Sequence, residues 1–263
     1  MMERHQFEHP LLEKALKELN QGNLFENEVM FVYENYEQKK ILPDIIGKTV
    51  HITENQFPHI YQLNLELSKK IGMDPLPVYV YEDFYYGLEC KGINTPWIEI
   101  SSKTITDFTD KELLFLLARE LGKVKMNYHY YHILLEEAEK AVHMQLFDQG
   151  VIKDSWKLVM YRWSRLSHYS LDNFGYALCG DIASAISAIS KTVLNSSFLA
   201  EQLHVPDYIK QSEDLQELDD DMYLFTKMDE RVPYAPHRIK SLIRYASSER
   251  GMKAAKYFHG GRN

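Results

Sequence analysis

Three ionisable side chains stand close together in an otherwise apolar stretch of the chain. Residues 113–125 read LLFLLARELGKVK, which places Arg119, Glu120 and Lys123 among leucines. Residues four apart share one face of an α-helix, so the two cations would point the same way. A carboxylate in a partly apolar cleft can act as a general base, and nearby cations can stabilise developing negative charge. Glu120 is therefore the candidate catalytic residue, with Arg119 and Lys123 as its electrophilic partners.

Helix signals on both sides of this stretch predict the elements that position it. Thr109-Asp-Lys-Glu112 is a capping box and predicts a helix over about 110–147. Thr53-Glu-Asn-Gln56 has the same form and predicts a helix that ends at Gly72. The periodicity of apolar residues predicts further helices at about 10–21, 155–171, 174–194 and 236–248.

Strand signals lie between the two capping boxes. Residues 77–81 and 97–101 alternate β-branched or aromatic residues with others, and Gly87 and Gly92 mark a hairpin-like turn between them. The acidic segment 212–230 is expected to be a solvated connection. The pattern predicts one α+β domain, mostly helical with a small sheet.

Composition narrows the class of protein. The chain has 263 residues, of which 45% are apolar, and a net charge of −8, which argues against a general nucleic-acid binder. It holds no run of about 18 apolar residues, so no transmembrane segment is expected. Cys90 and Cys179 lack metal-like spacing and fit buried thiols in a reducing compartment. These features favour a soluble, cytoplasmic protein.

The segment around Glu120 resembles the active-site helix of the gluzincin-type zinc metallopeptidases that include the CAAX prenyl endopeptidases and the bacterial membrane heat-shock peptidases. Members of that family have the motif H-E-L-G-H where this chain has Arg119-Glu-Leu-Gly-Lys123. In such a motif two histidines on one helical face bind Zn²⁺, and the glutamate polarises the attacking water. A glutamate from a later helix completes the zinc site.

Other segments carry the same resemblance in the same order. The run 53–81 is similar to the family's preceding helix and first strand, and Pro96–Ser101 to the strand beside the substrate cleft. Residues 163–181, WSRLSHYSLDNFGYALCGD, are similar to the helix of the third ligand, and Pro233 and Arg238 to a late element of the family. The resemblance implies a gluzincin-like α+β peptidase domain at 51–250, with its small sheet beside the active-site helix. A helical extension at 1–50 would precede it, and a tail at 251–263 would follow.

The positions of the three zinc ligands depart from the family. They are Arg119, Lys123 and His168, whereas Glu120 and the supporting Asp172 are retained. A guanidinium has no lone pair to donate, and an ammonium would have to lose its proton next to a dication. No metal and no cofactor are therefore expected, although zinc is usual in the family. The departures favour a catalytically degenerate pseudopeptidase.

Several roles are open for the altered site. The cations could pair with Glu120 and Asp172 in a buried ion network that only holds the helices together. They could instead bind an anionic group of a peptide, a protein or a small acidic ligand, while the cleft strand Trp97-Ile98-Glu99-Ile100-Ser101 pairs with an extended peptide. Glu120 could also serve in metal-free acid/base chemistry.

A displaced metal site is the last alternative, and it would restore an active metallopeptidase. His129, His132 and His143 follow the motif. In one continuous helix His129 and His132 would lie about two turns beyond Lys123, too far to join His168. The aromatic cluster at 79–86 is expected to pack on the core rather than to stack on nucleobases.

Overall fold

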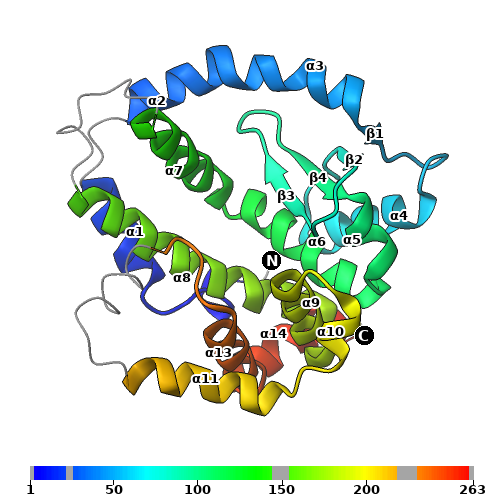
Figure 1. Cartoon of the computed structure of the whole chain (residues 1–263), viewed down its shortest axis with the longest axis vertical. Helices are drawn as coiled ribbons and strands as arrows, with labels where there is room; N and C mark the ends of the chain where they lie inside the picture. Colours follow the sequence, from blue (N-terminus) through cyan, green and yellow to red (C-terminus); the bar gives the residue numbers. More distant parts are fainter. Residues whose placement is uncertain (1–2, 22–25, 144–153, 218–229, 261–263) are drawn as a thin grey trace.

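The chain folds into many helices and one small sheet (Figure 1). The computed structural model describes residues 3–21, 26–143, 154–217 and 230–260. The helical elements are η1 (Arg4–Gln6), α1 (Leu12–Gln21), α2 (Glu26–Val32), η2 (Tyr33–Glu37), α3 (Gln38–Lys48), α4 (Pro58–Ile71), α5 (Ser102–Asp107), α6 (Asp110–Lys125), α7 (Tyr128–His143), α8 (Asp154–Cys179), α9 (Ile182–Leu194), α10 (Ser197–Glu201), α11 (Val205–Glu217), α13 (Ala235–Ala246) and α14 (Glu249–His259). The strands are β1 (Val50–His51), β2 (Val78–Tyr81), β3 (Leu88–Lys91) and β4 (Trp97–Ser101). The predicted α+β class, mostly helical with a small sheet, is confirmed.

The sheet is mixed, with strand order β1-β2-β4-β3. β2 and β4 run parallel, and β1 and β3 lie antiparallel to β2 and β4 respectively. β3 occupies the segment between Gly87 and Gly92 that we expected to be a turn, and it pairs Cys90 with Ile98. This strand matters for the site because it is the edge strand that contacts α6.

Helices α6 and α8 form the centre of the molecule and pack against each other over much of their length. Two glycines allow the close approach. A Cβ on Gly122 would lie 2.7 Å from the Phe174 ring, and one on Gly175 would lie 2.9 Å from the Phe115 carbonyl oxygen. Positions 119–123 of α6 therefore lie near positions 168–175 of α8. This close approach allows the ionisable side chains of the two helices to contact one another.

The start of α6 is the predicted capping box. The Thr109 N–H donates to Glu112 Oε2 at 2.7 Å. The same carboxylate is buried and accepts a hydrogen bond from Lys191 Nζ of α9 at 2.9 Å. Glu112 thus caps α6 and, through its ion pair with Lys191, joins α6 to α9.

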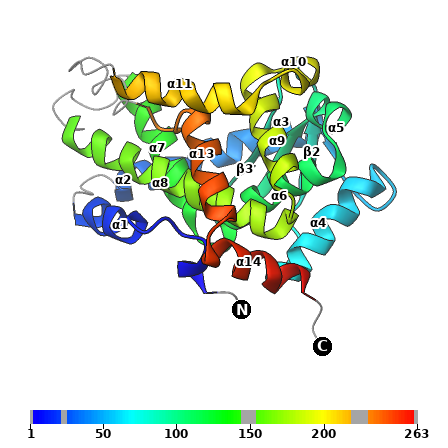
Figure 2. The same cartoon turned by 90° about the horizontal axis from the view of Figure 1, so that it is seen from below.

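Helices from the two ends of the chain cover α8. Contacts with α8 come from α1, α13 and α14, and Figure 2 shows α13 and α14 on one side of it. Residues 249–259 form α14, so a helix packed on the core lies in the segment that we expected to be a tail. The residues expected to form an N-terminal helical extension are largely helical where the structure describes them.

Three predicted helix boundaries are wrong. The long helix over 110–147 is broken at Asn127, whose φ of 61° is left-handed, so that α6 and α7 are separate helices. The break expected near residue 172 is absent, because α8 runs on to Cys179. Gly180, with φ of 70°, then ends it. Asp181 opens α9 by accepting hydrogen bonds from the Ala183 and Ser184 N–H groups.

The capping box predicted at Thr53 is also wrong. Thr53 and Gln56 exchange backbone hydrogen bonds of 2.9 and 3.1 Å and close a tight turn. The helix begins instead at Pro58, whose ring suits the first helical position, and it ends at Gly72 as predicted. The acidic segment forms the end of α11 at 212–217, and residues 218–229 of it lie outside the described part of the chain.

Two further predictions bear on the chain as a whole. Cys90 and Cys179 are both buried and free, as expected. Within the described ranges, no helix is both long enough and apolar enough to cross a bilayer.

Candidate functional site

An ion-paired group of side chains joins α6, α8 and α13 at the positions picked out from the sequence. Arg238 of α13 forms a two-pronged hydrogen bond with Asp172 of α8, from Nε to Oδ2 at 2.9 Å and from Nη2 to Oδ1 at 2.8 Å. Arg119 of α6 brings its Nε within 2.8 Å of the same Oδ1. Asp172 is only 1% exposed, so one buried carboxylate holds two guanidinium groups from different helices.

Burial and Asp172 act in opposite directions on these two arginines. Burial lowers the pKa of Arg119 from its ordinary value, although Asp172 works against the shift. Burial also acts to lower the pKa of Arg238, but the charge of Asp172, the hydrogen bonds to it and the nearby Tyr169 and Glu120 together raise that pKa. Arg238 is thus the primary ionic partner of Asp172.

Glu120, the candidate general base, is engaged through one oxygen. Its Oε2 lies 2.7 Å from Lys123 Nζ and accepts a hydrogen bond of 3.0 Å from the Cys90 N–H. Cys90 lies on the edge strand β3, so this carboxylate joins α6 to the sheet. Glu120 and Lys123 are 3% and 7% exposed. This arrangement suits a structural tie better than a base that must reach a substrate proton.

His168 lies against Arg119 as a neutral imidazole. Its Nδ1 is 3.3 Å from Arg119 Nη2. A guanidinium can only donate, so Nδ1 must be the acceptor and the ring proton must sit on Nε2. Burial, together with the positive charges around it, holds the pKa of His168 well below its ordinary value.

His132 joins this group, contrary to expectation. Its ring centroid is 5.2 Å from that of His168, in an edge-to-face arrangement. The prediction that His132 lies too far away is wrong because the chain turns at Asn127 and redirects α7. The hydroxyl of Ser167 donates to the Ser164 carbonyl, so it accepts from His132 Nε2 at 2.9 Å. Burial and the neighbouring cations hold the pKa of His132 well below its ordinary value.

The donor set does not fit a zinc ion. Zinc requires neutral imidazole, carboxylate or thiolate ligands. The two positions at which the resemblance implied zinc ligands, Arg119 and Lys123, carry cations that are ion-paired with carboxylates. His132 and His168 are two neutral imidazoles without a third ligand. Within the described ranges, no group of three or more histidine, cysteine or acidic side chains is placed to hold a metal. His129 lies beside the backbone of Lys123, with its Nε2 3.4 Å from the Ile93 carbonyl oxygen. The side chain of His143 lies outside the described part of the structure.

The strand expected to bind an extended peptide is enclosed. β4, which spans Trp97–Ser101, has β2 on one side and β3 on the other, so both of its edges are hydrogen-bonded. Ile98 and Ile100 are fully buried, Trp97 Nε1 donates to Glu99 at 2.8 Å, and Ser101 caps α5. An extended peptide therefore cannot pair with β4, contrary to the role suggested for it, and the edges of the sheet are β1 and β3.

Sequence reasoning identified Arg119, Glu120, Lys123, His168, Asp172 and Arg238, and the structure brings these six residues together. It missed Cys90 and His132. The Cys90 contact is made by a backbone amide and leaves no mark in the sequence. The signal for His132 was Asn127, a residue that tolerates the left-handed conformation that ends α6.

Comparisons of the chain with profiles of protein families, with curated proteins and with solved structures find no match.

Proposed function

We propose that this chain is a non-hydrolytic relative of the gluzincin zinc metallopeptidases that binds an acidic group at the former active site. The observation that carries the proposal is the pairing of Arg119 and Lys123, at two zinc-ligand positions, with Asp172 and Glu120. The order of elements supports the same reading, because a helix, a mixed sheet, the motif helix α6 and the third-ligand helix α8 follow one another. In this reading the two cations replace the charge of the lost metal.

The charges of the site favour an anionic ligand. Arg119, Lys123 and Arg238 supply three cations, and only Glu120 and Asp172 balance them. His132 and His168 are neutral, so the group carries one net positive charge. Arg119 shares its carboxylate with Arg238 and is the cation with least compensation. A carboxylate of a peptide, a protein or a small acid would complete its pairing, because a guanidinium matches the two oxygens of such a group.

Calorimetric titration with a matched pair of peptides tests this proposal. The ligands are one short neutral peptide as its free acid and the same peptide as its C-terminal amide. We expect the acid to bind at least about tenfold more tightly than the amide, because only the acid carries a negative charge that pairs with Arg119. Equal affinities, or no binding of either peptide, would contradict the proposal.

A variant pair assigns any binding to Arg119. Arg119→Lys keeps the charge but loses the planar fork, so we expect it to weaken binding of the acid while the melting temperature shows that the fold persists. Arg162→Lys is the control on the surface of α8, where Arg162 pairs with Glu18 at 2.7 Å. Affinity that is the same in Arg119→Lys and in the wild type would place the acid elsewhere.

A further inference from the structure

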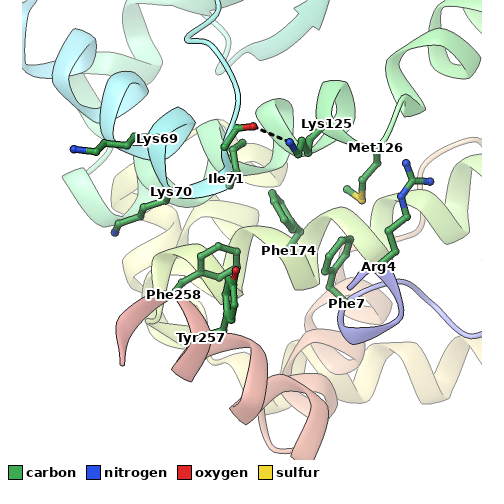
Figure 3. A pocket seen from close by; sticks show the side chains of 11 residues that line it. Arg4, Phe7, Lys69, Lys70, Ile71, Lys125, Met126, Phe174, Tyr257 and Phe258 are labelled. Carbon is green, nitrogen blue, oxygen red and sulfur yellow. Dashed lines mark hydrogen bonds between the residues drawn. The ribbon is translucent and has the colours of Figure 1, made fainter. Parts of the chain in front are cut away.

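A cavity lies between the ends of α4 and α6, the N-terminal turn η1 and the C-terminal helix α14 (Figure 3). Its volume is about 290 Å³, near the lower end of the range for small-molecule pockets. It contains none of the residues of the former active site. Phe174, which lines it, follows Asp172 by two positions and so points to the other side of α8.

The interior of this cavity is apolar and largely aromatic. Phe7, Met126 and Phe174 are each at most 4% exposed. Phe7 packs edge-to-face on Phe174 with ring centroids 4.9 Å apart, and Phe174 does the same with Phe258 at 6.3 Å. Rings that already support one another form a preformed surface for an apolar ligand.

The rim of the cavity is positive. Arg4, Lys69, Lys70 and Lys125 line it, and no aspartate or glutamate does. Within the described ranges, none of these four side chains forms an ion pair with a carboxylate, and Lys125 Nζ donates to the Gly72 carbonyl oxygen at 2.9 Å. In Figure 3 the rings lie between Arg4 on one side and the two α4 lysines on the other. These four cations make the rim of the cavity positive, although the net charge of the chain is −8.

Helix ends account for only part of this charge. Lys69, Lys70 and Lys125 lie in the last turns of α4 and α6, where cations stabilise the negative end of the helix dipole. Arg4 lies in the three-residue turn η1, across the aromatic rings from the α4 lysines.

We propose that this cavity binds an amphipathic carboxylate, namely a medium-chain fatty acid. The hydrocarbon chain would lie on Phe7, Phe174 and Phe258, and the carboxylate would meet the cations of the rim. Charge complementarity carries the assignment, because an uncharged hydrocarbon would gain nothing from Arg4 and the lysines. An inorganic anion would gain nothing from the rings.

Calorimetry of the full chain with decanoate below its micellar concentration tests the proposal, with decanol and inorganic phosphate as comparison ligands. We expect decanoate to bind at least about tenfold more tightly than either, and its affinity to fall with added salt. The double variant Arg4→Gln/Lys70→Gln should lose about tenfold in affinity and keep its melting temperature, because both side chains are exposed. Lys14→Gln changes an exposed lysine on α1 and should bind as the wild type does.

Three results would overturn the proposal: decanol binding as tightly as decanoate, phosphate binding as tightly as decanoate, or unchanged affinity in the double variant. The last comparison uses anionic phospholipid vesicles. Binding to these vesicles without binding to decanoate would overturn the proposal and would show that the cationic rim faces a membrane surface. Decanoate is itself a small acid of the kind proposed for Arg119, so Arg119→Lys is titrated beside the double variant. Loss of affinity in the double variant assigns decanoate to the cavity, whereas loss in Arg119→Lys alone would assign it to the site around Arg119 and overturn the proposal.

Discussion

At the scale of single residues, Asp172 has the largest structural role in the ion-paired group of α6, α8 and α13. It accepts both prongs of Arg238 and lies 2.8 Å from Arg119 Nε, while only 1% of its surface is exposed. Removing one partner of a buried ion pair leaves an uncompensated charge, which costs far more than the intact pair contributes. Two arginines would be left uncompensated here.

Asp172→Asn should therefore lower the free energy of unfolding by about 3–5 kcal/mol. Urea denaturation monitored by circular dichroism measures the change. The matched control is Glu13→Gln, which removes an exposed carboxylate paired with Lys17 on α1 and should leave stability unchanged. Equal midpoints for Asp172→Asn and the wild type would show that the ion network does not stabilise the fold.

His168 gives the site a pH dependence whose sign follows from its lowered pKa. The unfolded chain protonates this histidine near its ordinary value of 6.5, whereas burial and the surrounding cations keep it neutral in the fold. The unfolded state then binds more protons below about pH 6.5, so stability falls as the pH is lowered from there.

The urea midpoint of the wild type should thus be lower at about pH 5.5 than at about pH 7.5, and His168→Gln should show a smaller difference. His204→Gln, at an exposed histidine of the surface, should keep the full wild-type difference. If the stability of His168→Gln depends on pH as strongly as that of the wild type, His168 has the same pKa in the folded and unfolded states, which would contradict this prediction.

At the scale of elements, the turn between α6 and α7 shapes the site. Asn127 adopts a φ of 61° and is exposed, so its contribution comes from its backbone conformation more than from side-chain contacts. By redirecting α7 it brings His132 within 5.2 Å of His168. Asparagine and glycine tolerate this conformation better than other residues.

Asn127→Ala should destabilise the chain by about 1–2 kcal/mol, whereas Asn127→Gly should be close to neutral. Thermal or urea unfolding of the two variants measures the difference. Equal stability of both variants would contradict a left-handed residue at this turn.

Around this turn, some features could be predicted from the sequence and others could not. The Thr109 capping box placed the start of α6 correctly, because its signal is local. Arg119, Glu120 and Lys123 followed from their spacing, whereas His168, Asp172 and Arg238 followed only from the resemblance to the metallopeptidase family. Periodicity could not locate the break at Asn127, since apolar residues continue on both sides of it. Nor could it place β3, because Leu88–Lys91 is short and its tie to α6 comes from the Glu120 carboxylate, 30 residues along the chain.

At the scale of the whole molecule, an acidic chain gathers cations in two separate places. One is the ion-paired group of α6, α8 and α13, where Arg119, Lys123 and Arg238 exceed their carboxylates by one charge. The other is the cavity behind α8, where four cations surround aromatic rings. Both places favour anions, and we propose that anionic ligands are what this chain has come to recognise in place of a catalytic metal.

We propose that paired cations stand where a related peptidase would bind zinc, and the metal content of the purified, untagged chain tests this proposal. Zinc is measured by elemental analysis before and after incubation with zinc followed by dialysis. We expect less than about a tenth of an equivalent of zinc in both samples, because the ion-paired cations Arg119 and Lys123 cannot act as metal ligands. About one equivalent that survives dialysis would contradict it and would return His132 and His168 to consideration as metal ligands.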